Sequence, residues 1–101
     1  MKILAIEKET AGTTDEQFGP LLRPEAERAW ELYRSGVIRE LYFRADREEA
    51  VLILECRDIE EASRALDSLP LVHNGLISFD LIPLAPYPGF ERLFRPPPSS
   101  I

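Results

Sequence analysis

Hydrophobic and polar positions recur along the chain with two periods, and together they predict four strands and two helices. Short runs rich in Ile, Leu and Val indicate strands, whereas apolar residues three or four apart behind a capping residue indicate helices. The order strand, helix, strand, strand, helix, strand is the ferredoxin-like α+β pattern, a four-stranded antiparallel sheet with two helices on one face. The expected strands are residues 2–9, 37–45, 50–57 and 76–84, and the expected helices are residues 15–35 and 59–69, the second ended by Pro70.

The first helix has clear boundary signals and an interruption between them. A Thr14-x-x-Gln17 capping box starts it, and Gly36 is a typical C-terminal signal. Pro20 and Pro24 lie inside this span. Because proline lacks the backbone donor and crowds the preceding turn, we expect a kink or a broken first half.

One acid, Glu25, interrupts the apolar stripe of this helix. At helical spacing the stripe comprises Phe18, Leu22, Glu25, Ala29 and then Leu32 or Tyr33. A carboxylate there has to be paired, protonated or facing a cavity, because burying an unpaired charge costs several kcal/mol. Either Glu25 transfers protons in a pocket, or it is a structural acid that pairs with Arg28 or reaches solvent.

The strands also predict an assembly. The first and last strands carry apolar side chains on both faces, and one subunit can cover only one face of its sheet with helices. A homodimer, or a higher oligomer built from dimers, is the expected solution. The chain is expected to form one domain over residues 1–94, with a Pro- and aromatic-rich arm at 85–94 that packs on the dimer or over a pocket. A flexible tail is expected at residues 95–101.

Composition narrows the function classes. The net charge of −6, with basic and acidic residues interspersed, argues against nucleic acid as a partner. No apolar run is long enough for a membrane span or a signal peptide, so a cytoplasmic protein is expected. The single cysteine, Cys56, lies in an apolar strand and is expected to be a buried structural thiol. No phosphate loop, metal-ligand spacing or catalytic triad pattern is present, and we expect no cofactor and no metal.

Several motifs resemble muconolactone isomerase. They are Leu69-Pro70-Leu71, the strand Phe79-Asp80-Leu81-Ile82-Pro83-Leu84, Leu41-Tyr42, and a first helix that runs from Glu25-Ala26 to Arg34-Ser35-Gly36. The resemblance implies a dimeric α+β barrel with a pocket between helices and sheet. It also implies isomerisation of a small lactone acid by proton transfer, with Glu25 at the position of the family's acid.

Two departures from the family pattern accompany this resemblance, a missing lysine and a longer turn between Leu71 and the last strand. Leu22 stands where the family has a lysine, which leaves Arg23 as the nearest basic residue. The chain is also similar to YciI-like proteins, whose histidine would fall on Glu25 and whose aspartate would fall on Leu69, so that their dyad is absent here.

The remaining candidates each have two interpretations. In one interpretation, His73 and Arg23 are polar partners of Glu25, with His73 as the base. In the other, His73 is an exposed loop histidine and Arg23 is a surface arginine. Trp30, Tyr33 and Tyr42 bind a flat substrate, or belong to the core or an interface. Arg39 and Arg44 are possible carboxylate binders, and Glu7 and Asp80 are possible pocket acids, although ordinary surface pairs and strand-end charges are the alternatives.

The sequence thus predicts an intramolecular isomerase that transfers a proton on a small organic acid or lactone. Two other functions stay open, a non-catalytic module that binds small ligands or partners, and a cofactor-free monooxygenase on the same barrel.

Overall fold

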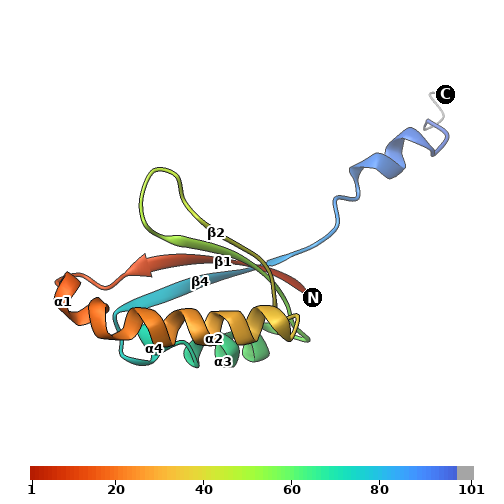
Figure 1. Ribbon diagram of the computed structural model, residues 1–101. Helices are drawn as coiled ribbons and strands as arrows, with labels where there is room; N and C mark the ends of the chain where they lie inside the picture. Colours follow the sequence, from red (N-terminus) through yellow and green to blue (C-terminus); the bar gives the residue numbers. More distant parts are fainter. Residues whose placement is uncertain (98–101) are drawn as a thin grey trace.

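The structure is a computed structural model that describes residues 1–97, and its elements follow the expected order (Figure 1). The strands are β1 (Lys2–Glu9), β2 (Ile38–Phe43), β3 (Ala50–Glu55) and β4 (Ile77–Leu84). The helices are α1 (Asp15–Phe18), α2 (Leu22–Arg34), α3 (Ile59–Asp67) and α4 (Pro70–His73), with 3₁₀ turns η1 (Gly19–Leu21) and η2 (Gly89–Leu93).

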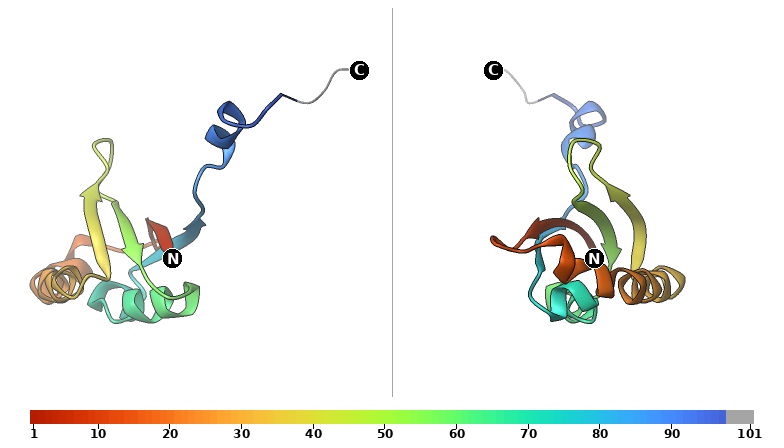
Figure 2. Two further views of the ribbon diagram at one scale, coloured as in Figure 1. Left: turned by 90° about the vertical axis from the view of Figure 1, so that its right-hand side faces the viewer. Right: turned by 60° about the vertical axis from the view of Figure 1, so that its left-hand side comes forward.

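The four strands form one antiparallel sheet in the order β2-β3-β1-β4. Helices α2, α3 and α4 lie on one face of this sheet, and the other face is open (Figure 1 and Figure 2). This arrangement confirms the expected ferredoxin-like α+β fold. None of the helices in residues 1–97 has the length and apolar character needed to cross a membrane.

The first helix is broken, as its two prolines predict. Gln17 accepts a hydrogen bond from the Thr14 backbone N–H at 2.8 Å, which completes a capping box for the single turn of α1. Pro20 then lies in η1 and Pro24 in the first turn of α2, where a missing N–H breaks no helical bond. The result is two short segments, α1 and η1, before the long helix α2 begins.

Side chains on the helix-facing side of β1 and β3 make the core. Ile3, Ala5, Leu52 and Leu54 are at most 2% exposed. They pack beneath the apolar stripes of α2 and α3, which contribute Leu32, Ala62 and Leu66. The alternation along β1 and β3 therefore places every second residue on the core side, as the sequence pattern predicts.

The expectation that Pro70 ends the second long helix is wrong. Helix α3 ends earlier, at Asp67, and Pro70 begins the separate helix α4, with Leu69 in an extended conformation before it. A proline at the first helical position has its φ angle preset for the helix and sacrifices no hydrogen bond. The segment that was expected to be a loop around His73 is therefore one helical turn.

Residues 85–97 extend away from the body of the molecule (Figure 1 and Figure 2). The radius of gyration is 18.3 Å and the longest extent is 70 Å, whereas a compact chain of this length has a radius of about 13 Å. Tyr87, Phe90, Leu93 and Phe94 are 67–84% exposed. The arm therefore does not cover a pocket of its own subunit. Of the expected tail at 95–101, residues 98–101 lie outside the described residues.

Candidate functional site

Glu25 faces a cavity of about 270 Å³ between helix α2 and the sheet, which we call the chamber. Its walls are almost entirely apolar and come from α2, α4 and all four strands. The lining residues are Glu7, Leu22, Glu25, Ala26, Ala29, Ile38, Leu41, Phe43, Ala50, Leu52, Leu69, Leu71 and Phe79. The only ionisable side chains among them are two carboxylates, which therefore dominate the chemistry of the chamber.

A backbone amide holds the Glu25 carboxylate in place. Its Oε1 accepts a hydrogen bond from the Leu71 N–H at 2.9 Å, in the first turn of α4. Burial raises the pKa of Glu25, and the bond from Leu71 opposes part of that rise. The alternative pairing with Arg28 is not formed, because Arg28 donates to Ser68 and Glu31 instead. Within residues 1–97, Glu25 is thus a carboxylate without a basic partner, beside an apolar space.

Glu7 is the second carboxylate of the chamber. It follows Ile3 and Ala5 on the helix-facing side of β1 and is 7% exposed. Its Oε1 accepts a hydrogen bond from the Ala50 N–H at 3.1 Å. Burial is the main cause of its raised pKa, and the negative charges of Glu49, Glu9 and Glu25 raise the pKa further. From the sequence, Glu7 was predicted only as a possible pocket acid. The alternation of Ile3, Ala5 and Glu7 along β1 is the signal that places it on the helix-facing side.

Glu7 should make the protein less stable as the pH rises. Its pKa is higher in the folded than in the unfolded chain, so the folded state binds more protons above the unfolded value of 4.5. The free energy of unfolding should fall as the pH rises from that value through the folded pKa. Glu7→Gln keeps an oxygen for the Ala50 N–H and removes the charge. We expect it to be more stable than wild type at pH 8, with a flatter pH profile.

Urea unfolding between pH 4 and pH 8 measures this difference. Glu16→Gln, at an exposed position on α1, is the matched control and should follow the wild-type profile. A Glu7→Gln variant that is less stable than wild type at pH 8 would show that the charged form is the stabilising one.

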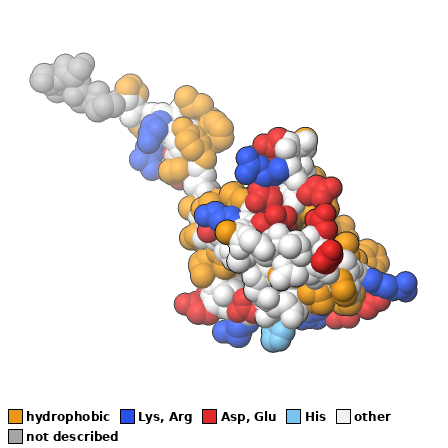
Figure 3. Space-filling view, turned by 90° about the vertical axis from the view of Figure 1, so that its left-hand side faces the viewer, with side chains coloured by type: hydrophobic (Ala, Val, Ile, Leu, Met, Phe, Trp, Pro, Cys, Tyr) orange, Lys and Arg blue, Asp and Glu red, His pale blue; other side chains and the backbone are white. Residues whose placement is uncertain are grey.

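A second cavity, of about 350 Å³, adjoins the chamber, and we call it the mouth. The two cavities share Glu7, Leu22, Phe43 and Leu71 as lining residues. The other lining residues are Glu9 at the end of β1, Asp15 and Phe18 on α1, and Glu48 in the β2–β3 turn. Acidic side chains gather at this end of the molecule (Figure 3). The chamber therefore borders on an acidic opening.

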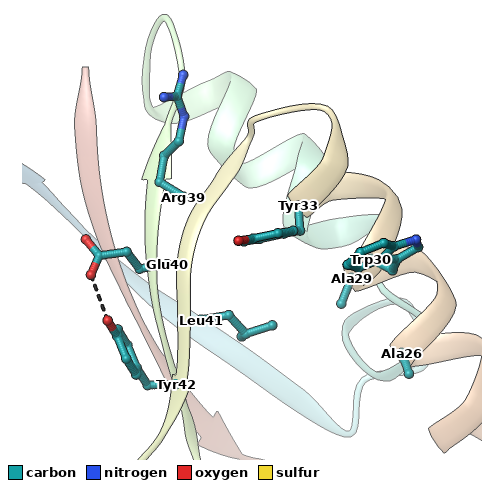
Figure 4. A pocket seen from close by; sticks show the side chains of 8 residues that line it. All are labelled: Ala26, Ala29, Trp30, Tyr33, Arg39, Glu40, Leu41 and Tyr42. Carbon is teal, nitrogen blue, oxygen red and sulfur yellow. Dashed lines mark hydrogen bonds between the residues drawn. The ribbon is translucent and has the colours of Figure 1, made fainter.

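The predicted aromatic binding residues line a different space, a groove of about 660 Å³ between α2 and the edge strand β2. Trp30 and Tyr33 stack with ring centroids 5.9 Å apart. Tyr42 lies on the other side of β2, where its hydroxyl donates to Glu40 at 2.8 Å (Figure 4). That bond raises the pKa of Tyr42. The groove shares Ala26, Ala29 and Leu41 with the chamber, so Trp30 and Tyr33 stand beside the chamber and outside it.

Arg23 and His73 are not brought to Glu25. The Arg23 side chain is 91% exposed and pairs with Glu27 at 3.3 Å. His73 is exposed at the end of α4 and lines neither the chamber nor the mouth. Pro70 is the physical reason for the position of His73, because the helical turn it starts points Leu71 inward and leaves His73 outside. The structure gives no support to either residue as a partner of Glu25.

Arg44 and Asp80 form surface pairs, Arg39 donates a hydrogen bond to the Gly36 carbonyl at 2.6 Å, and Cys56 lies in the core. Arg44 binds Asp46, and Asp80 pairs with Lys8 on the open face at 2.7 Å. Cys56 is a free thiol and 5% exposed, as expected, and burial raises its pKa. Residues 1–97 contain no group of three or more His, Cys, Asp or Glu side chains arranged to hold a metal ion.

Comparison with known proteins agrees with the resemblance in the sequence. A family model described as muconolactone delta-isomerase matches residues 5–89. A crystal structure of muconolactone isomerase superposes with a TM-score of 0.69 at 20% sequence identity, over 87% of this chain and 92% of that chain, which shows a shared fold. Comparison with curated proteins gave no match. Because the family model runs from β1 to the start of η2, the chain belongs to the muconolactone delta-isomerase family.

Proposed function

We propose that the protein isomerises a small organic acid or lactone by moving a proton between two carbons, without a cofactor. The observation that carries the proposal is the Glu25 carboxylate in the apolar chamber, with its pKa raised by burial. A carboxylate whose pKa is shifted toward neutrality can both accept and return a proton near pH 7. Family membership supports the same chemistry.

The hydrogen bond to Glu25 suggests how the proton would move. The Leu71 N–H binds Oε1 and fixes the carboxylate, which leaves Oε2 as the base. In the first step Oε2 takes a proton from the carbon next to a carbonyl, and the electron pair of the C–H bond moves into an enolate. In the second step the Glu25 carboxylic acid returns this proton to another carbon of the conjugated system. No oxidant or reductant is required, because substrate and product have the same atoms and electrons.

Glu7 is suited to assist as an acid in its neutral form. A carboxylic acid kept neutral in an apolar site can donate a hydrogen bond to an enolate oxygen as negative charge develops there. The raised pKa of Glu7 and its burial in the chamber support this role. Glu7 and Glu25 would then have different tasks, one stabilising charge and the other moving the proton.

Deuterium exchange tests the proposed reaction. Unsaturated γ-lactones are incubated with the protein in D₂O and followed by proton NMR, while the amide signal of Leu71 reports binding. We expect formation of the double-bond isomer, with deuterium at the carbon that receives the proton wherever the Glu25 carboxylic acid has exchanged with D₂O. A lactone that shifts the Leu71 signal but neither isomerises nor incorporates deuterium would contradict proton transfer and favour a module that only binds ligands. Oxygen consumption in the same sample would favour the monooxygenase.

We also propose that the protein is a homodimer joined through the open face of its sheet. This face carries Leu4 and Ile6 of β1, Val51 and Ile53 of β3, and Ile82 and Leu84 of β4, which the strand register places side by side. Ile82 and Leu84 are 42% and 40% exposed. A second sheet packed on this face would bury them, and the projecting aromatic arm supports contact with a further subunit.

A further inference from the structure

The arm at residues 85–97 has an apolar surface that its own subunit does not cover. Four of its side chains are 67–84% exposed, and we call them the anchors: Tyr87, Phe90, Leu93 and Phe94. Phe90 and Leu93 are three residues apart in η2 and therefore lie on one side of the turn. The anchors together present roughly 500 Å² of apolar surface, since a complete aromatic side chain has about 150–250 Å². An exposed apolar cluster of this size marks an interaction surface.

The arm is folded as a unit although it projects from the molecule. The rings of Tyr87 and Phe90 make an edge-to-face contact, with their centroids 5.1 Å apart. Tyr87 also covers Gly89 so closely that a Cβ atom at this position would overlap the tyrosine ring. These two anchors are therefore held in place before they meet a partner, which lowers the entropic cost of binding.

The groove between α2 and β2 is a second uncovered apolar surface. Tyr33 and Leu41 point into the space between the helix and the strand, next to Ala29 and Trp30 (Figure 4). Trp30, Tyr33 and Leu41 are 47–59% exposed. Because β2 is an edge strand, no further strand of the same sheet covers the groove. The groove shares Ala26, Ala29 and Leu41 with the chamber, so a segment that filled the groove would also form the outer wall of the chamber.

The arm leaves the molecule on the side where the second subunit of the proposed dimer would lie. From the end of β4 it rises on the side of the sheet opposite the helices (Figure 1 and Figure 2). Residues 85–88 and η2 together reach up to ~20 Å, at ~3.3 Å per extended residue and ~2 Å per 3₁₀ residue. The sheet of a subunit packed on the open face would lie ~10 Å away. The arm is therefore long enough to reach the edge strand of that sheet.

We propose that the anchors of one subunit dock in the α2–β2 groove of the subunit that faces it, and that each groove is filled by the partner's arm. Each arm with its groove would bury roughly 1,000 Å², less than the about 1,200–2,000 Å² of a stable interface, so arm docking adds to the contact between the open faces and depends on it. The arm carries two arginines and one acid in a chain of net charge −6, which favours its contact with another copy.

The proposal uses the proposed dimer only to place the second subunit, and it does not depend on the proposed reaction. Phe90, Leu93 and Phe94 follow residue 89, where the match to the family model ends, so the contact does not follow from family membership. In the assembled protein, the arm of the partner would complete the wall of the chamber and exclude water from it at Ala26 and Ala29.

Trp30 is the only tryptophan of the chain, and its fluorescence reports on the groove. Acrylamide quenches this fluorescence when it reaches the indole ring. We expect the double variant Phe90→Ala with Phe94→Ala to raise the quenching constant at least ~2-fold over wild type, because docked anchors exclude solvent from the surface that they cover. Glu91→Gln, on the same turn, removes no anchor and should leave the quenching constant at the wild-type value.

Mixed dimers test whether the arm docks in a second copy. The double variant is unfolded in urea and refolded together with an excess of Trp30→Phe protein, which keeps its anchors and contributes no tryptophan signal. We expect Trp30 of the double variant to regain the wild-type quenching constant, because the arm of the Trp30→Phe partner fills its groove. The matched control is Trp30→Phe protein that also carries both Phe→Ala substitutions, and it should give no protection.

Two results would overturn the proposal. One is a wild-type Trp30 that is quenched as readily as Trp30 of the double variant. The other is a Trp30 of the double variant that stays unprotected after refolding with the Trp30→Phe protein, which would place the arm in the groove of its own subunit. Light scattering separates this failure from that of the proposed dimer, because dimers with a quenchable Trp30 contradict arm docking alone, whereas monomers contradict both.

Discussion

Replacing Glu25 with glutamine should slow proton transfer by ~10²–10⁴-fold, the usual contribution of a general acid–base group. Glutamine keeps the side-chain length and an oxygen that can accept the hydrogen bond from the Leu71 N–H. It cannot take up and return a proton. The loss should therefore appear in kcat, measured by deuterium exchange of a bound lactone, while circular dichroism and the thermal midpoint show an intact fold.

The matched control for this change is Glu27→Gln. Glu27 lies on the same helix, is exposed, and pairs with Arg23 at the surface, so its loss should leave kcat within about twofold of wild type. Wild-type turnover in the Glu25→Gln variant would remove Glu25 from the mechanism, even if the chamber still binds the lactone.

The second large effect is expected at the open face of the sheet. Ile53→Lys puts a charge in the centre of the proposed dimer contact, next to Leu4 in the strand register. Burying an ammonium group without a partner costs several kcal/mol, which corresponds to a rise in the dimer Kd of ~100-fold or more. Light scattering should find wild-type protein at twice the 11.5 kDa mass of the chain and the variant at the mass of the single chain.

Asp67→Lys is the control for this variant. It introduces the same side chain on exposed α3, in the layer of helices away from the open face, and it should leave the dimer intact. A wild-type protein that is monomeric at micromolar concentration, or an Ile53→Lys variant that remains dimeric, would contradict the proposed interface.

The fold followed from the sequence because its signals are local. The Thr14 capping box, the two prolines and the alternation along β1 each act within a few residues, and each determined an element that the structure confirms. The prediction that Pro70 ends the second long helix was wrong for the same reason, because the signal of a proline is local. A proline is equally compatible with ending one helix and with starting another, and only the packing of Leu71 into the core selects the second outcome.

The site was predictable only in part, because a cavity is a property of distant segments. The position of Glu25 in an apolar stripe could be read from the spacing along one helix. Its hydrogen bond to Leu71, 46 residues later, could not. The acidic mouth could not be predicted from the sequence either. Glu9, Asp15 and Glu48 lie in separate polar segments, and only the tertiary fold brings them together.

The break between α1 and α2 separates residues that line the mouth from Glu25, the acid proposed to transfer the proton. Entry of ligands and proton transfer can therefore evolve independently. Asp15 and Phe18 precede the break and face the mouth, whereas Glu25 follows it and is anchored to α4. Substitutions on α1 can change which molecules enter without moving the acid that would act on them. A lineage that keeps α2 and α4 while it varies residues 13–21 could therefore acquire new substrates in single steps, each testable by exchanging this segment between relatives.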